Sequence, residues 1–272
     1  MKRHRIFSFD FDSRAHSLEP MQDHWDRRVK ELHARNKENT IRQLMQQYGE
    51  QNIETKVKNF QELQIKPFSI AAFHNKFLEQ IRNSYVIGSY YPALTGACAL
   101  GERILNHMMI ILRDYHKNSP EYKKIYGKNS FDYWPLAIDT LESWGELLPD
   151  AAEKFRELNK KRNRAIHFNP ETDHDDKPLA LAAIHLIQAI VATQFAAFGN
   201  QPWYFCIPGE IYIKKSWENH PVVKEIFIPN SILVGPKHII EGLLPQIIIN
   251  DNFDYEEKEI TDQDYCELRK NG

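Results

Sequence analysis

LALAAIHLIQAIVATQFAAF, residues Leu179 to Phe198, is the stretch that most constrains the fold. It contains no Lys, Arg, Asp or Glu, and it matches the roughly 20 residues that span a bilayer. Polar residues such as His185 and Gln188 interrupt it, and a mean hydropathy of -0.57 for the chain offers no second candidate span. We therefore expect a buried core helix, with an interface helix and a membrane anchor as the alternatives.

The composition around this helix is that of a globular chain. It has 272 residues, 42% of them hydrophobic and 12% aromatic, which is enough to bury a core without disulfides or metals. Because 35 Lys and Arg oppose 37 Asp and Glu, any nucleic-acid binding must come from a local patch. The three cysteines lack zinc or thioredoxin spacing, and the first residues lack the apolar core of a secretory signal, so we expect a cytoplasmic protein with reduced thiols.

Apolar residues recur at helical spacing in four further segments upstream of this stretch. Pro67 stands where the first begins, small residues allow the second to pack closely, and Pro170 ends the fourth. The expected helices cover residues 67–88, 90–116, 130–147 and 151–166. Joined by short loops to the apolar stretch, they predict an antiparallel bundle over residues 67–199.

The two flanking segments differ from the bundle. Residues 1–66 begin with an expected strand at Ile6 to Phe11 and continue as a charged, mostly helical arm. Residues 200–272 predict two to four strands and an acidic tail that docks or frays, with a short helix at Asp262 to Arg269. The expected fold class is mainly α: an antiparallel helical bundle with a helical N-terminal arm and a small C-terminal β-containing appendage.

The strongest chemical signal is LNKKRNRAIHF, at the end of the fourth expected helix. Four residues separate Arg162 from His167, and Asn163 directly follows the arginine. A guanidinium binds phosphate through bidentate hydrogen bonds, and an imidazole transfers protons at neutral pH. This pair suffices for RNA cleavage without a metal: the 2'-hydroxyl attacks the phosphorus, His167 serves as acid or base, and Arg162 stabilises the phosphoryl charge.

Neighbouring residues add a local basic patch that suits RNA, formed by Lys160, Lys161 and Arg164. The same separation also joins Arg28 to His33 in the charged arm, so spacing alone does not identify a site. The alternative is that Arg162 and His167 are solvated residues at a helix end, with His167 as a capping cation.

Motif and helical context together resemble the HEPN superfamily of nucleotide-binding and ribonuclease domains. The family motif is an Arg, a polar residue, and a His within four to six positions, which Arg162, Asn163 and His167 match. The segment YYPALTGACALGERILN resembles an earlier helix of such domains, with Glu102 beside Arg103 after a run of small residues. The resemblance covers about half the chain, from Pro67 to Gly199, and excludes both flanking segments.

The resemblance implies an all-α domain that dimerises and acts as a metal-independent endoribonuclease in toxin-antitoxin, abortive-infection or antiphage systems. Its implied catalytic residues are Arg162, His167 and Asn163, supported by Glu102 and Arg103. It implies an RNA substrate, a homodimer or higher oligomer, and an inhibitory or sensing protein partner, with no metal, cofactor or membrane. Some HEPN-like domains are non-catalytic scaffolds, so a scaffold or an RNA- or protein-binding module is the alternative.

Helix geometry bears on the dimer. Residues five apart on a regular helix point about 140° away from each other. Arg162 and His167 therefore reach one phosphate only if the helix end unwinds or partner residues complete the site. Glu102 either orients a catalytic Arg or His across the cleft or forms an ordinary salt bridge with Arg103 or a neighbouring helix.

Two further motifs have simpler structural interpretations. PETDHDD, from Pro170 to Asp176, offers metal-ligand types, but an acidic loop before a helix is typical of an N-terminal cap set. FDFDS, from Phe9 to Ser13, resembles the nucleophile loop of haloacid-dehalogenase-type phosphotransferases, but no alternating strand-helix pattern follows it. We expect no metal site in the first and an edge strand with solvated acids in the second.

Overall fold

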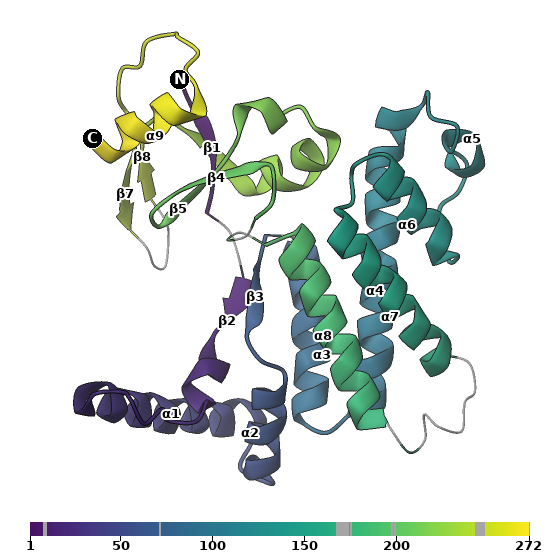
Figure 1. The fold of residues 1–272 in the computed structure, drawn as a ribbon, viewed down its shortest axis with the longest axis vertical. Coiled ribbons are helices and arrows are strands. Elements are labelled where there is room, and N and C mark those ends of the chain that lie inside the picture. Colours follow the sequence, from purple (N-terminus) through teal and green to yellow (C-terminus); the bar gives the residue numbers. More distant parts are fainter. Residues whose placement is uncertain are drawn as a thin grey trace. The chain divides into compact units, whose positions relative to one another are not determined.

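The computed structural model describes residues 1–7, 10–70, 72–166, 174, 176–196, 198, 200–242 and 248–271. The chain forms two compact units, one of residues 1–9 with 197–272 and one of residues 10–196 (Figure 1). Helices predominate and the strands are short, which confirms the expected mainly α class. Residues 1–66, expected as one part, are divided between the two units.

The larger unit is built from helices and one pair of short antiparallel strands. Its described α-helices are α1 (Arg27–Tyr48), α2 (Ile53–Glu62), α3 (Ala72–Val86), α4 (Tyr90–Leu112), α5 (Tyr122–Ile125), α6 (Trp134–Ser143), α7 (Pro149–Ile166) and α8 (Asp176–Gln194). Its described 3₁₀ helices and strands are η1 (Arg14–Leu18), η2 (Arg113–His116), β2 (Asp10–Asp12) and β3 (Lys66–Ser69).

Helix α4 is central to this unit and packs against α3, α6, α7 and α8. Its small residues let the neighbours approach closely. A Cβ on Gly101 would lie 2.7 Å from Cη2 of Trp134 on α6 and 2.8 Å from Cδ2 of Leu158 on α7. Because both distances are below van der Waals contact, glycine at this position sets how closely α6 and α7 pack on α4.

Helix α8 is the core helix that the apolar stretch predicts. Ala183, Ile187 and Val191 are buried in it, and it packs against α4 and α7. Among the described helices it is the one long and apolar enough, by length and composition, to cross a membrane. Its place in the core accounts for that composition.

Several helix boundaries expected from the sequence are wrong. Pro67 lies in β3 rather than at a helix start, because an edge position in a two-stranded sheet tolerates its missing N–H, and α3 begins at Ala72. The connection from α4 to α6 is not a short loop, since it contains η2 and α5. Helix α8 ends at Gln194 because the chain then turns extended, with Ala196 bridging to Ser69 of β3.

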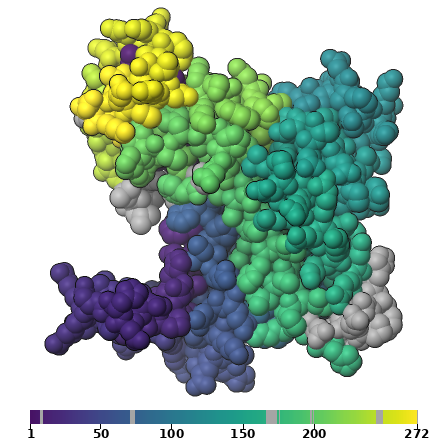
Figure 2. All heavy atoms as spheres, viewed as in Figure 1, coloured from purple at the N-terminus to yellow at the C-terminus, as the bar shows by residue number. Residues whose placement is uncertain are grey.

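The charged helical arm expected in the first segment is present as η1, α1 and α2. Asp26 caps α1, with Oδ1 accepting the Val29 N–H at 2.9 Å, and Gly49 ends it at a φ of 79°. Within α1, which is described throughout, the buried residues are Thr40 and Leu44 alone. Figure 2 shows the purple spheres of η1 and α1 projecting beside the blue region of α2 and α3.

The smaller unit contains a four-stranded antiparallel sheet with the order β4-β5-β1-β6. Its described strands are β1 (Arg3–Ile6), β4 (Tyr204–Ile207), β5 (Glu210–Ile213), β6 (Ser231–Val234), β7 (Ile239–Gly242) and β8 (Ile248–Asn250). Its described helices are η4 (Lys215–Trp217), η5 (Val223–Phe227), η6 (Ile228–Asn230) and α9 (Asp262–Asn271). The N-terminal strand thus pairs with C-terminal strands on both sides, a partnership that local sequence does not reveal.

Two strand expectations are corrected. The single strand expected at Ile6 to Phe11 is instead divided between β1 in one unit and β2 in the other. The described chain beyond residue 199 contains five strands, β4 to β8, rather than two to four. The acidic tail docks through α9, whose buried Tyr265 donates its hydroxyl hydrogen to the Val234 carbonyl at 3.1 Å.

Candidate functional site

The proposed motif lies at the C-terminal end of α7. Arg162 and Asn163 are in the helix, which ends at Ile166. His167 lies outside the described residues, as does most of the acidic loop of residues 170–175. The geometry that the structure describes here is therefore that of Arg162 and the residues around it.

Arg162 is held by side chains from two other helices. Its Nη2 pairs with Oε2 of Glu102 on α4 at 2.9 Å, and its Cζ lies 5.6 Å from the centre of the Trp134 ring at the start of α6. Trp134 donates its indole N–H to the same Glu102 oxygen at 3.2 Å. Since each member contacts the other two, the guanidinium is fixed by α4, α6 and α7 together.

Asn106 fixes the approach to α6. One turn after Glu102 on α4, it accepts the Phe131 N–H at 2.6 Å through Oδ1 and donates to the Phe131 carbonyl at 3.1 Å through Nδ2. These two hydrogen bonds to Phe131 anchor the chain just before Trp134, whose ring is fully buried. The tryptophan therefore holds its position independently of Arg162.

The site remains accessible on one side. The Arg162 side chain is 21% exposed and that of Glu102 is 36% exposed. Glu102 contacts the guanidinium through one nitrogen, and no other acceptor among the described residues bonds it. Because a guanidinium has five N–H donors, Arg162 can bind an anion without releasing Glu102.

Cys98 lies one turn before Glu102 on α4 and is buried. Burial raises the pKa of its thiol to about 12, and the opposing influence of the Arg162 charge is smaller. The thiol is consequently protonated at neutral pH, so nucleophilic cysteine chemistry is disfavoured at this site.

Arg103, although adjacent to Glu102, faces another helix. Its Cζ lies 4.6 Å from the centre of the Phe77 ring on α3. One turn further along α4, burial and the Arg103 charge lower the pKa of His107. The structure thus brings Glu102 to Arg162 but places Arg103 beside α3.

The basic residues of α7 surround Arg162 with differing exposure. Lys160 and Asn163 are exposed, and Lys161 and Arg164 are partly exposed. They form a polar and basic end of α7 on an otherwise nearly neutral chain. Such a surface suits a phosphate-bearing ligand.

Sequence reasoning missed Trp134 and Asn106. A buried indole N–H generally needs an acceptor, which marks Trp134 as a residue with a partner. That partner lies 32 positions away on another helix, so no local pattern identifies it. Asn106 shows no sequence signal beyond a polar residue within an apolar helix.

Of the two motifs given simpler interpretations, that of Pro170 to Asp176 lies mostly outside the described residues, whereas Asp10 and Asp12 of the FDFDS motif are described. Asp12 of β2 pairs with Arg14 at 2.8 Å, and Asp10 binds buried Lys66 at 2.5 Å. No group of three or more His, Cys, Asp or Glu residues in the described part of the chain is arranged to hold a metal ion. The carboxylates of β2 thus act as ion-pair partners of Arg14 and Lys66 rather than as the solvated acids expected.

Comparison with protein-family models, with curated proteins and with solved structures finds no match to this chain. Function must therefore follow from the motif and from the geometry of Arg162, Glu102 and Trp134.

Proposed function

We propose that the bundle is a HEPN-type, metal-independent endoribonuclease in which Arg162 and His167 are the catalytic residues. The observation that carries the proposal is the position of Arg162, clamped by Glu102 and Trp134 yet partly exposed. Fixed donors accelerate a reaction because they need no reorganisation when charge develops. An arginine held in this way, five residues before a histidine, suits phosphoryl chemistry.

In the proposed reaction the ribose 2'-hydroxyl attacks the adjacent phosphorus. One catalytic group removes the hydroxyl proton as the new P–O bond forms, and a proton is delivered to the departing 5'-oxygen as its bond to phosphorus breaks. The products are a 2',3'-cyclic phosphate and a 5'-hydroxyl. His167 transfers the proton, Arg162 stabilises the phosphoryl oxygens, and Asn163 positions the phosphate or the histidine.

Glu102 has a positioning role in this scheme. It keeps the guanidinium plane aligned through Nη2 while other N–H donors face the phosphate. Trp134 covers the guanidinium and shares the Glu102 oxygen. Loss of Glu102 is expected to leave a charged but mobile arginine.

Cleavage of total RNA and tRNA in excess EDTA tests the proposal. The wild-type protein is expected to cut and leave 2',3'-cyclic phosphate ends, whereas Arg162→Gln and His167→Ala do not. Arg156→Gln is the matched control, because Arg156 also lies on α7 and pairs across helices, with Asp139 at 2.7 Å and Glu142 at 2.6 Å. Activity retained in both motif variants, at matched thermal stability, would overturn the assignment.

A homodimer completes the proposed site if the arginine and the histidine of one cleft come from different copies. Mixing Arg162→Gln with His167→Ala then restores cleavage to about a quarter of the wild-type rate, because half the dimers are mixed and each has one intact site. No recovery in a mixture shown to exchange subunits would place both residues of a site in one chain.

A non-catalytic module is the second candidate, and one observation favours it. Glu102 neutralises Arg162 within the chain, as in an ordinary structural ion pair. This candidate predicts binding of RNA or protein without turnover and no effect of His167→Ala on that binding.

The family resemblance extends the proposal to a cytoplasmic toxin or antiphage effector restrained by an inhibitory or sensing protein. Induced expression of the wild-type chain is then expected to arrest growth, and His167→Ala is expected to relieve the arrest. Arrest of equal strength with both proteins would separate toxicity from the proposed chemistry.

A further inference from the structure

Helix α1 carries more positive charge than it neutralises. It has six basic residues and two acidic ones. Both acids are used within the helix, in the pairs Arg27–Glu31 at 2.7 Å and Arg42–Glu38 at 3.6 Å. The basic residues of α1 with no ion-pair partner among the described residues are Arg28, Lys30, Arg35 and Lys37.

Three of the arginines form a stripe along one side of α1. Arg28, Arg35 and Arg42 recur every seven residues, so they lie on one side about 10.5 Å apart. A hollow of about 450 Å³ lies between the first two and is bordered by Glu31 and Leu32 as well. The stripe therefore offers regularly spaced cations, and the hollow between the first two is lined by one apolar residue, Leu32.

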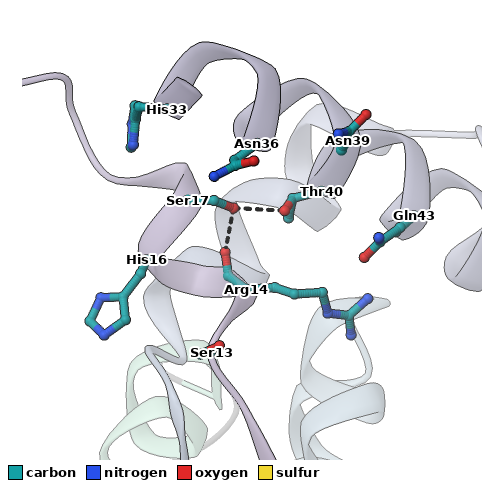
Figure 3. A pocket seen from close by; sticks show the side chains of 9 residues that line it. All are labelled: Ser13, Arg14, His16, Ser17, His33, Asn36, Asn39, Thr40 and Gln43. Carbon is teal, nitrogen blue, oxygen red and sulfur yellow. Dashed lines mark hydrogen bonds between the residues drawn. The ribbon is translucent and has the colours of Figure 1, made fainter. Parts of the chain in front are cut away.

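A second hollow, of about 500 Å³, lies on the flank of the same helix, between α1 and η1 (Figure 3). The hydroxyls of Ser17 and Thr40 are 2.6 Å apart and join the two elements beneath it. Asn36, Asn39 and Gln43 line the α1 side, and among the described residues no protein group bonds their amides. Three amides with both donors and acceptors therefore face the hollow.

Cationic and imidazole groups complete this hollow. Arg14, His16 and His33 line it, and none of its described lining residues is a carboxylate. Two carboxylates lie just outside the lining: Glu19 is bonded to His16 at 2.8 Å, and Asp12 pairs with Arg14 at 2.8 Å. The hollow thus combines amides, imidazoles and a guanidinium, groups that recognise nucleotides.

We propose that η1 and α1 of the arm bind single-stranded RNA, with phosphates on the Arg28, Arg35 and Arg42 stripe and bases in the hollow lined by the amides. Guanidinium groups bind phosphates by charge and by paired hydrogen bonds. Side-chain amides match the mixed donors and acceptors of base edges. That the bound RNA is the substrate rests on the proposed ribonuclease function.

An RNA strand fits these surfaces better than a membrane does. A helix that lies on a membrane needs a broad apolar face, and Leu32 is the one apolar residue beside the arginine stripe hollow. The NH2 groups of the side-chain amides can donate to a phosphate of either ligand, but a phosphate offers no donor to their carbonyl oxygens, whereas a base edge both donates and accepts. The arm therefore favours a nucleic acid over an anionic lipid surface.

The arm also lies toward the bundle end at which α8 begins. Helix α1 packs against α2, and Glu62 at the end of α2 pairs with Lys177 in the first turn of α8 at 2.9 Å. The chain enters α8 directly after the segment that follows α7, and Figure 1 shows the lower ends of α7 and α8 at this end of the unit. RNA on the arm can therefore continue toward the α7 end.

Binding is measured by fluorescence anisotropy of a labelled 20-nucleotide single-stranded RNA, in EDTA and over a range of salt, with all proteins carrying His167→Ala to prevent cleavage. Arg28→Gln/Arg35→Gln is expected to weaken binding about tenfold and to lower the salt slope by about 1.4, since each single-strand phosphate contact contributes about 0.7. Asn36→Ala/Gln43→Ala is expected to weaken binding with the slope unchanged. Both variants change exposed residues, and circular dichroism verifies their folding.

The control is Lys123→Gln/Lys124→Gln, which removes two exposed charges from α5 and is expected to bind like the parent. Equal weakening by the control and by the arginine variant, or no RNA binding by the parent, overturns the inference. Arm-dependent binding to phosphatidylserine vesicles but not to RNA overturns it in favour of a membrane. Arm-dependent RNA binding by a wild-type protein that does not cleave retains this inference and removes the ribonuclease.

Discussion

The bundle and the arm of the larger unit stabilise arginine in different ways. In the bundle, Arg162 of α7 reaches Glu102 on another helix, so two backbones fix its guanidinium. In the arm, Arg27 pairs with Glu31 one turn away on the same exposed helix, a kind of pair worth about 0.3–0.5 kcal/mol. The difference suggests that the function of Arg162 in the bundle depends on the orientation of its guanidinium. RNA binding by the arm should depend instead on the number of its positive charges.

Arg162→Lys should produce the largest effect. A lysine ammonium lacks the planar fork that binds Glu102 and a phosphate together, so cleavage should fall about 10²- to 10³-fold. The measurement is the single-turnover rate of RNA cleavage, with Arg156→Lys on the same helix as the control. In the arm, by contrast, Arg28→Lys should weaken RNA binding less than Arg28→Gln does. An Arg162→Lys enzyme with nearly full activity would show that charge alone suffices in the bundle.

Gly101→Ala tests the rigidity of the bundle. The added Cβ would lie 2.7 Å from Trp134 and 2.8 Å from Leu158, so the free energy of unfolding should fall by about 1–3 kcal/mol. Displacement of Trp134 should also lower cleavage. Urea denaturation measures the first effect, and Gly127→Ala, where a Cβ meets no atom within 4 Å, is the control. Equal free energies of unfolding for the two variants would mean that α6 and α7 can move away from α4 without loss of stability.

The sequence predicts most helices of the bundle because their signals are local. Apolar spacing identifies α4 and α8. Pairing between distant segments leaves no such signal. Strand β1 is central in its sheet only because it meets β5 and β6, more than 200 residues further along the chain.

The same distinction applies to the candidate site. Spacing and context make Arg162, Asn163 and His167 the candidates, and the family resemblance adds Glu102. The contact of Glu102 with Arg162 spans two helices, and the contribution of Trp134 depends on a third. Residues that position a catalytic group act through tertiary contacts, so the fold is needed to find them.

Buried His74 makes the stability of the bundle depend on pH in a way that an exposed histidine of the arm does not. Burial, with smaller contributions from His107 and Arg103, lowers the pKa of His74 to about 2. Between that value and its ordinary 6.5 the unfolded chain binds one more proton than the folded chain. The stability that neutral His74 contributes is therefore fully present above pH 6.5. Below pH 6.5 the free energy of unfolding should fall by up to about 1.4 kcal/mol per pH unit.

His74→Gln should remove this contribution to the slope, as measured by urea denaturation from pH 7 to pH 4.5. His24→Gln in the exposed segment before α1 is the control and should keep the wild-type slope. Identical slopes in wild type and His74→Gln would mean that the histidine charges without unfolding the bundle.

Glu31→Gln in the arm should give the smallest effect and the clearest test of charge number. The change releases Arg27 from its pair beside the arginine stripe, so helix stability should fall by only about 0.3–0.5 kcal/mol. RNA binding should tighten about threefold and its salt slope should steepen by about 0.7, because one more cation reaches a phosphate. Anisotropy across salt measures both, with Glu267→Gln, a change of an exposed residue of α9, as the control for net charge. Since both variants lose one negative charge, equal tightening would attribute RNA affinity to the whole protein, whereas tightening by Glu31→Gln alone would assign it to the arm.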